Sequence, residues 1–374
     1  MAAVLATPPA SKPGDEHFLR IDHLTKRFDD VAAVDDVSLS IRKGEIFALL
    51  GSSGCGKSTL LRMLAGFETP TSGHILLENR DISTEPPYER PINMMFQSYA
   101  LFPHLTVWEN IAFGLRRDGL PKAEIAQRVD EMLALVQLGK FARRKPHQLS
   151  GGQQQRVALV RSLAKKPRVL LLDEPLGALD KKLREQTQLE LVNIIKQVGV
   201  TCVMVTHDQE EAMTMADRIA IMSAGSFLQV GAPHEIYETP ANRFVADFIG
   251  NVNLFDGSLT VDEPDHVVID TPQCRFYVSH GITGTEGMPV TVALRPEKIA
   301  LARETPASTE FNAAQVTVAD YAYFGSFTLY VLAFPGGLKV KVSVANTDRH
   351  GEYFAIGDKL WASWAAEALV VLTS

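Results

Sequence analysis

A glycine-rich octapeptide is the segment whose residue types most directly specify chemistry. Gly51–Ser58 reads GSSGCGKS; an apolar run, Glu45–Leu50, precedes it and a helix-like segment, Ser58–Ala65, follows it. Glycines let backbone amides wrap phosphate oxygens, and the start of a helix adds positive potential. Lys57 would supply a point charge to the outer phosphates, and the Ser58 hydroxyl would ligate Mg²⁺. A chance glycine-rich turn is the alternative, and the Lys-Ser ending argues against it. The phosphate-binding residues we expect are Gly51, Ser52, Ser53, Gly54, Cys55, Gly56, Lys57, Ser58 and Thr59.

Two carboxylates end an apolar, strand-like run. Val169–Glu174 reads VLLLDE. Asp173 would hold Mg²⁺ through water, and Glu174 would polarise an attacking water in phosphoryl transfer. Many strands end in an aspartate, so the pair alone specifies little. In a chain that also has a phosphate-binding loop, the pair indicates phosphoryl transfer more strongly, because that reaction needs a carboxylate near the metal and a base.

The pentapeptide LSGGQ at Leu149–Gln153 stands shortly before that run and opens a helix-like segment. The combination of the three segments resembles the ATP-binding cassette (ABC) family. The resemblance implies that this segment lies across the nucleotide of a partner subunit, with its polar groups near the γ-phosphate. Taken alone, Ser-Gly-Gly before a helix also fits an N-cap. The residues that the resemblance assigns here are Ser150, Gly151, Gly152 and Gln153.

Four single residues extend the resemblance. Gln97, after the strand-like NMMF, matches the family's loop that senses Mg²⁺ and touches the membrane partner. Asp180 ends the Ala-Leu-Asp that matches the inter-subunit loop, and His207 after TCVMVT matches the histidine that contacts the γ-phosphate. Phe28 matches the aromatic that stacks on adenine. The resemblance thus implies ATP and Mg²⁺ as cofactors. It also implies catalysis by Glu174, His207 and Lys57, and metal contacts from Ser58, Gln97 and Asp173.

Alternating strand-like and helix-like segments must position these residues. Strand-like runs at 168–172, 201–205 and 219–222 alternate with helix-like runs at 181–197 and 209–215, which predicts a parallel α/β sheet. Residues 99–166 are mostly helical in pattern; within them, 122–138 carries an apolar stripe of helical period. The fold class we expect is therefore an α/β P-loop NTPase of the ABC ATPase type with an inserted helical subdomain.

The pattern changes after about residue 251, where short alternating runs are punctuated by Gly and Pro, as in a small antiparallel β barrel. VALRPEKI at Val292–Ile299 resembles the OB-like (TOBE) regulatory barrel of transporter ATPases. Whether this barrel only stabilises a dimer or also senses a regulator stays open. We expect a flexible extension at 1–17, an ABC ATPase domain at 18–250 with its helical subdomain at about 99–166, and the TOBE domain at 251–374.

Composition excludes several classes of protein. The 374 residues are 46% apolar and 22% charged, which argues against disorder. Residues 1–251 carry 29 Lys and Arg against 30 Asp and Glu, and residues 252–374 carry 8 against 14, so neither part has the basic excess that nucleic-acid binding needs. The chain has no apolar run long enough to span a membrane and no secretory signal, so the membrane partner must be a separate polypeptide.

The family resemblance also implies partners. One phosphate-binding loop and one LSGGQ cannot meet within one copy of this fold, so we expect a head-to-tail homodimer that sandwiches two ATP molecules. Segments such as RPINMMFQSYALFPH closely resemble the ATP-binding subunits of bacterial putrescine importers. This implies two integral-membrane permease subunits, indirectly a periplasmic polyamine-binding protein, no nucleic acid, and a peripheral place on the cytoplasmic side of the inner membrane. Import of spermidine, a sugar, iron or sulfate remains the alternative.

Overall fold

The computed structural model describes residues 17–177, 181–307, 310–348 and 353–373. The chain forms two compact units, residues 1–233 and 234–374, and each is described by itself. Most of the extension expected at 1–17 lies outside the described residues. None of the described helices is long and apolar enough to cross a bilayer.

A six-stranded sheet forms the centre of the first unit, in the order β10-β9-β3-β8-β7-β6. Five of its strands are parallel and β10 joins the edge antiparallel to β9. The inner strands are buried on both faces, which explains their continuous apolar runs. The strands are β3 (Ile46–Gly51), β6 (Ile92–Met95), β7 (Val169–Asp173), β8 (Thr201–Thr206), β9 (Arg218–Ser223) and β10 (Ser226–Gly231).

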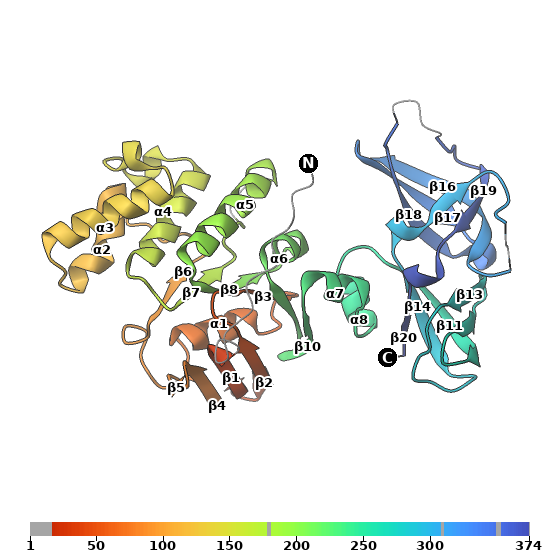
Figure 1. Cartoon of the computed structure of the whole chain (residues 1–374), viewed down its shortest axis with the longest axis horizontal. Helices are drawn as coiled ribbons and strands as arrows, with labels where there is room; N and C mark the ends of the chain where they lie inside the picture. Colours follow the sequence, from red (N-terminus) through yellow and green to blue (C-terminus); the bar gives the residue numbers. More distant parts are fainter. Residues whose placement is uncertain (1–16, 178–180, 308–309, 349–352, 374) are drawn as a thin grey trace. The chain divides into compact units, whose positions relative to one another are not determined.

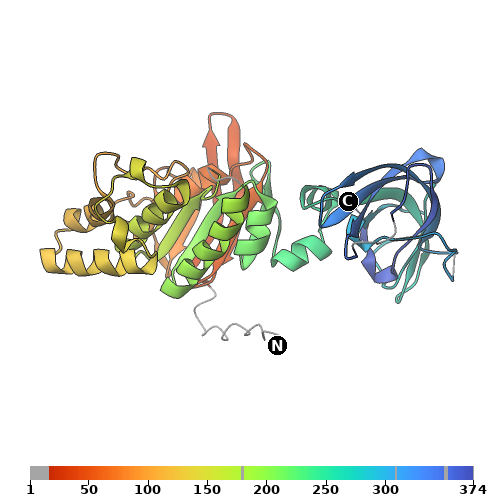
Figure 2. The ribbon, with the colours of Figure 1, turned by 90° about the horizontal axis from the view of Figure 1, so that it is seen from above.

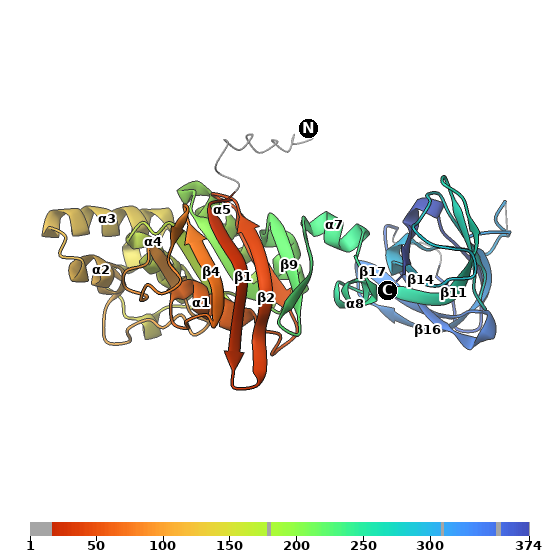
Figure 3. The same ribbon diagram turned by 90° about the horizontal axis from the view of Figure 1, so that it is seen from below.

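An antiparallel sheet, β2-β1-β4-β5, packs its apolar residues into the same core as the central sheet. Figure 3 shows β4, β1 and β2 side by side. Its strands are β1 (Leu19–Phe28), β2 (Val31–Ile41), β4 (Ser72–Leu77) and β5 (Arg80–Asp81).

Helices connect the parallel strands, and three of them form the helical insertion between β6 and β7 that the sequence predicts. One helix ends earlier than expected: Gln137 takes a left-handed φ of 57° and the Leu138 amide bonds back to Leu133, which ends the helix before residue 138. The helices of this unit are α1 (Lys57–Ala65), α2 (Val107–Arg117), α3 (Lys122–Leu135), α4 (Gly151–Ala164), α5 (Lys181–Val198) and α6 (Gln209–Met215).

The second unit is a barrel-like pair of five-stranded antiparallel sheets around one apolar core, with strands curving about a common interior (Figure 2). Two short helices, α7 (Pro233–Glu238) and α8 (Arg243–Phe248), precede it. One sheet contains β11 (Asn253–Asp262), β12 (Val267–Asp270), β13 (Arg275–Val278), β14 (Pro289–Leu294) and β20 (Leu369–Leu372). The other contains β15 (Ala300–Ala302), β16 (Ala313–Tyr323), β17 (Phe327–Ala333), β18 (Lys339–Ala345) and β19 (Lys359–Ser363).

The expected fold class, an α/β ATPase with a helical insertion followed by an OB-like barrel, is confirmed. The compact units divide after residue 233, so α7 and α8 group with the barrel, whereas the sequence pattern counts them with the ATPase domain. The domain boundary near residue 250 stays a prediction.

Candidate active site

The loop between β3 and α1 folds so tightly that glycine is required at three positions. A Cβ on Gly51 would lie 2.3 Å from the Met222 carbonyl oxygen, and one on Gly56 would lie 2.1 Å from the Ala33 carbonyl oxygen. Gly54 has open space around it but a φ of 81°, a conformation that disfavours other residues. The α1 helix has no side-chain cap, so its first amides are available to an anion.

Lys57 is buried beneath this loop, with only 6% of its surface exposed. Its ammonium donates hydrogen bonds to the carbonyl oxygens of Gly51 and Ser52, each at 2.8 Å, and lies 3.6 Å from the Cys55 Sγ atom. The loop therefore surrounds the Lys57 ammonium. When a phosphate binds, its oxygens would accept hydrogen bonds from this ammonium in place of the two carbonyl oxygens or together with them. Of the other residues expected here, Ser52, Ser53, Gly54 and Ser58 are exposed and Gly56 and Thr59 are half-buried.

Three expected residues that are far apart in the sequence meet at the carboxyl ends of adjacent strands. Gln97 follows β6, Glu174 follows β7 and His207 follows β8. The Gln97 amide donates to Glu174 Oε2 at 2.7 Å, and His207 Nδ1 lies 3.1 Å from Glu174 Oε1. Both carboxylate oxygens of Glu174 are thus engaged, and the carboxylate is centred between an amide and an imidazole.

Asp173 ends β7 next to this group. Burial, and secondly the charge of Glu174, raise the pKa of the Asp173 carboxyl, while Arg62 acts in the opposite direction. Burial and a neighbouring carboxylate both disfavour the ionised form of Asp173, and a bound cation would stabilise that form. Among the described residues no group of three or more His, Cys, Asp or Glu could hold a metal alone. Asp173 and Glu174 offer the hard oxygen donors that Mg²⁺ prefers, and Mg²⁺ commonly completes its shell with phosphate oxygens and water.

Phe28 is the last residue of β1 and is 46% exposed, with the Lys26 ammonium 4.8 Å from its ring centre. It pairs with Val31 across the β1–β2 turn, close in sequence to Ala33, the residue that touches the phosphate-binding loop at Gly56. The structure therefore shows an exposed aromatic ring at the end of the strand pair that contains Ala33.

The LSGGQ segment lies at the start of α4. Ser150 caps that helix by accepting from the Gln153 amide, and the Gln153 side chain accepts from the Ser150 amide in return. Gly151 and Gly152 form the first helical positions. The N-cap interpretation is therefore correct for Ser150. The cap occupies the Gln153 amide, and the amides of Gly151 and Gly152 are left for an anion.

No hydrogen bond or ion pair joins residues 150–153 to residues 51–59 in the part of the chain that the structure describes. Figure 1 places α4 with α2 and α3, away from α1. The two segments do not build one site within a single copy. Asp180, expected in the inter-subunit loop, lies outside the described residues.

Two polar residues of α4 that the sequence analysis passed over hold this site in place. Arg161 donates to the carbonyl oxygens of Tyr99 (2.9 Å) and Ala100 (2.7 Å), two residues with left-handed φ in the loop after Gln97. Gln155 is 1% exposed and donates to the Pro175 carbonyl oxygen, directly after Glu174. No sequence pattern marks them, because polar residues in a helix normally face solvent.

Comparison with known proteins agrees with this geometry. Residues 34–177 match the ABC transporter family, and residues 292–372 match the TOBE domain family. The chain is 58% identical over 358 residues to the putrescine transport ATP-binding protein PotG of Escherichia coli, with 95% of each chain covered. It is 50% identical to the spermidine/putrescine import ATP-binding protein PotA of Rubrobacter xylanophilus, covering 97% of this chain and 96% of that protein.

A solved structure gives the same fold. The dimeric structure of MJ0796, a bacterial ABC transporter cassette, matches with a TM-score of 0.51 and 33% identity, covering 57% of this chain and 98% of that one. The protein is an ATP-binding cassette of the nucleotide-hydrolysing class. It belongs to the ABC transporter family, as the relatives matched over nearly its whole length establish.

Proposed function

We propose that this chain is the ATP-hydrolysing subunit of a polyamine importer, with putrescine as the favoured solute. The observation that carries the proposal is the 58% identity to a putrescine transport ATP-binding protein over 95% of both chains. A match over 95% of both chains includes the C-terminal barrel as well as the ATP-binding cassette. Two relatives named for both spermidine and putrescine, from Rubrobacter xylanophilus and Nitrosomonas europaea, are 50% and 47% identical.

The phosphate-binding loop would grip the β- and γ-phosphates of ATP. Amides at the start of α1 donate to phosphate oxygens, and the Lys57 ammonium moves from the Gly51 and Ser52 carbonyls toward the outer phosphates. The exposed Phe28 ring stacks on adenine. Because the Lys57 side chain is buried, it has already lost most of its conformational freedom before ATP binds.

Glu174 would act as the general base. Its carboxylate accepts from Gln97 and faces His207, so its oxygens are oriented before substrate arrives. A water held by Glu174 gives up a proton to this carboxylate as its oxygen bonds to the γ-phosphorus. The bond from that phosphorus to the β–γ bridging oxygen breaks, so ADP and inorganic phosphate are the products. His207 positions the water and the γ-phosphate. When bound, Mg²⁺ would neutralise phosphate charge, held by the Ser58 hydroxyl and Gln97 and, through water, by Asp173.

The second half of each site would come from another copy of the chain. The free start of α4, with Ser150, Gly151 and Gly152, supplies donors for a γ-phosphate bound to the partner's loop. Two copies arranged head to tail complete both sites at once, with ATP between them. ATP between the two copies would hold the dimer closed. Hydrolysis would remove the γ-phosphate contacts and let the dimer open.

Membrane coupling would use the loop after Gln97. Phe102 in this loop lies 4.4 Å from Phe113 of α2, measured between ring centres, and Phe113 is 42% exposed. Partly exposed aromatics are typical of protein interfaces. These aromatic side chains would contact the integral-membrane permease subunits, of which the transporter has two. The permease subunits would in turn bind a periplasmic polyamine-binding protein. The chain would then sit peripherally on the cytoplasmic side of the inner membrane.

Reconstitution tests the proposed solute. The chain is purified together with candidate permease subunits, placed in liposomes, and supplied with a candidate periplasmic binding protein and labelled solutes. We expect ATP-dependent uptake of putrescine, abolished by Glu174→Gln. Uptake of a sugar, iron or sulfate with no uptake of polyamine would overturn the solute assignment while leaving the ATPase assignment intact.

A further inference from the structure

A second cavity lies in the first unit at the amino end of the parallel sheet, opposite the edge that holds Glu174 and His207. Its volume is about 410 Å³, within the range of small-ligand pockets. It is lined by the segments before β1, between β2 and β3, before β7 and before β8, and by one face of α3. None of its lining residues belongs to the nucleotide site.

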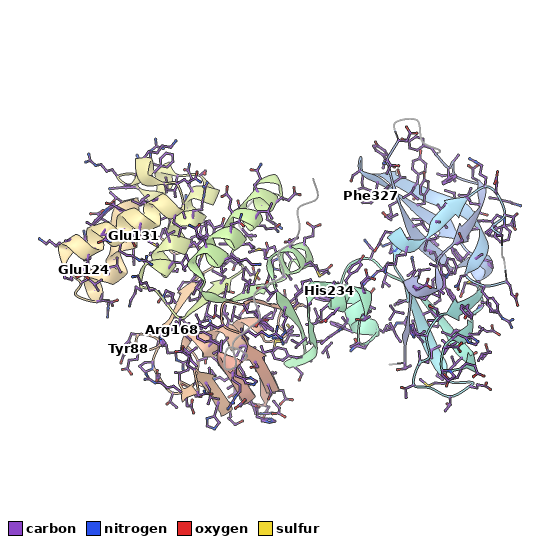
Figure 4. The ribbon with its side chains drawn as sticks, in the orientation of Figure 1. Tyr88, Glu124, Glu131, Arg168, His234 and Phe327 are labelled. Atoms are coloured by element: carbon purple, nitrogen blue, oxygen red, sulfur yellow. The ribbon has the colours of Figure 1, made fainter. Side chains whose placement is uncertain are left out.

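Four cations and no carboxylate line this cavity. The cations are Lys43, Arg128, Lys166 and Arg168. Two carboxylates from outside the lining compensate part of the charge: Glu131 pairs with Arg128 at 3.1 Å, and Glu78 pairs with Arg168 at 3.3 Å. Subtracting these two from the four leaves a charge of about +2. Figure 4 labels Arg168 near the sheet and Glu131 on α3.

Arg128 is fixed in place by the protein itself. Its guanidinium donates to the carbonyl oxygens of Leu163 (3.1 Å) and Ala164 (3.0 Å) at the end of α4, besides its pair with Glu131. A guanidinium has five N–H groups, so about two remain available to a ligand. This pre-set donor lowers the entropy lost when an anion binds.

Apolar groups form the other side of the cavity. Phe18 and Met132 are buried at 4% exposure each, and Val200 at 5%. The Lys43 ammonium lies 5.9 Å from the centre of the Phe18 ring, so cation and aromatic surface face the same space. A ligand that fits both sides has an anionic group and an apolar body.

We propose that this cavity binds a small organic phosphate, a phosphate monoester carried on an apolar or aromatic body. Lys43 and Lys166 form no ion pair in the described structure, although the charge of Lys166 acts on the nearby Glu131 carboxylate. Arg128 and Arg168 supply forked donors that suit phosphate oxygens. The ligand would join α3 of the helical insertion to the starts of β7 and β8, the strands that Glu174 and His207 directly follow. The cavity would thus give the ATPase a second, regulatory anion site.

The probe is 1-naphthyl phosphate, titrated by fluorescence into the full-length chain at low salt with ADP saturating the nucleotide site. We expect saturable binding of one probe per chain that weakens as salt rises. Lys43→Ala with Lys166→Ala should weaken binding on the order of tenfold, as the loss of two partly exposed charge pairs predicts. Lys122→Ala, at the exposed start of α3 and outside the cavity, is the matched control and should leave binding unchanged.

Each other outcome overturns the proposal. If the double variant binds as the parent does, or if Lys122→Ala weakens binding equally, the probe sits elsewhere. Equal affinity for uncharged 1-naphthol would mean that the cavity selects apolar bodies and not phosphates. Binding only to phosphatidylcholine vesicles that contain phosphatidic acid, with none of the soluble probe, would assign the cations to a lipid surface. Circular dichroism of each variant confirms that it is folded.

Discussion

Glu174 is held in a backbone conformation that few residues other than glycine adopt. Its φ is 45°, and its amide donates to the Val205 carbonyl oxygen of the neighbouring strand at 2.9 Å. Strain of this kind persists only where surrounding contacts impose it, and it gathers at functional sites. Here it turns the side chain out of β7 toward Gln97 and His207.

The proposed base gives a direct prediction at this scale. Glu174→Gln keeps the shape and the hydrogen bonding but removes the proton acceptor. We expect ATP hydrolysis by the assembled transporter to fall on the order of 10²-fold or more, while ATP binding stays within about twofold. Turnover is measured by phosphate release and binding by a fluorescent ATP analogue.

Glu89→Gln serves as the control for this substitution, because Glu89 is exposed and lies away from the carboxyl ends of the strands. It should retain parental turnover. Near-parental hydrolysis by Glu174→Gln would remove Glu174 from the role of base.

At the scale of elements, Arg295 in the VALRPEKI segment joins α7 and α8 to the barrel. Its guanidinium, 5% exposed, donates to the carbonyl oxygens of Ala246, Ile249 and Asn251 at the end of α8 and of Tyr237 in α7. It also lies 4.1 Å from the Tyr237 ring centre. Burial, and secondly a hydrogen bond to Glu297, raise the pKa of Tyr237 to about 12, so its phenol stays protonated at neutral pH.

We call these hydrogen bonds of Arg295 the Arg295 clamp, and we expect its loss to weaken the packing of α7 and α8 on the barrel. Arg295→Met keeps much of the apolar stem but leaves the four carbonyl groups without their donor. We expect the second unit to be destabilised by roughly 2–4 kcal/mol. Hydrogen exchange at the amides of residues 243–249 should accelerate accordingly, which mass spectrometry would measure.

Arg275→Met is the matched control in the same unit. Arg275 is exposed and pairs with Asp270 at 2.8 Å, and an ion pair in such a place contributes little to stability because solvent screens it. If the amides of residues 243–249 exchange at the same rate in the Arg295→Met and Arg275→Met variants, the proposed role of Arg295 in holding α8 is contradicted.

At the scale of the whole molecule, the phosphate-binding loop and the start of α4 do not meet within one copy. The proposed head-to-tail dimer therefore makes ATP part of the interface. We expect Glu174→Gln, which retains ATP, to form a dimer with MgATP in light scattering. Adding Ser150→Arg should leave it monomeric, because a bulky cation would block the partner's γ-phosphate region.

Thr106→Arg in the same background separates this effect from simple loss of a helix cap. Thr106 caps α2 with the same reciprocal pattern by which Ser150 caps α4. The Thr106 variant should still dimerise. A Ser150→Arg chain that dimerises as well as its parent would refute the head-to-tail arrangement.

Apolar pattern and turn chemistry made much of the fold predictable. The runs at β3, β7 and β8 are buried on both faces, so their strands follow from the sequence. Several strands were not predicted, among them β11, β13, β19 and β20 of the barrel and β4 at the edge of the first unit. They are short or half-exposed, and strands distant in the sequence pair with β4, β19 and β20.

By itself, the sequence determined the chemistry of the phosphate-binding loop. Glycine spacing, Lys57 and Ser58 lie within one strand–turn–helix unit, so a local pattern is enough to recognise the loop. The close approach of the Met222 and Ala33 carbonyl groups to its glycines comes from the tertiary structure. Only the tertiary structure decided that Glu174 is centred between Gln97 and His207, that Arg161 secures the loop beside them, and that four cations line one cavity. These arrangements depend on the order of strands in the sheet and on packing between helices. Contacts of that kind join residues far apart in the chain, and local sequence patterns do not encode them.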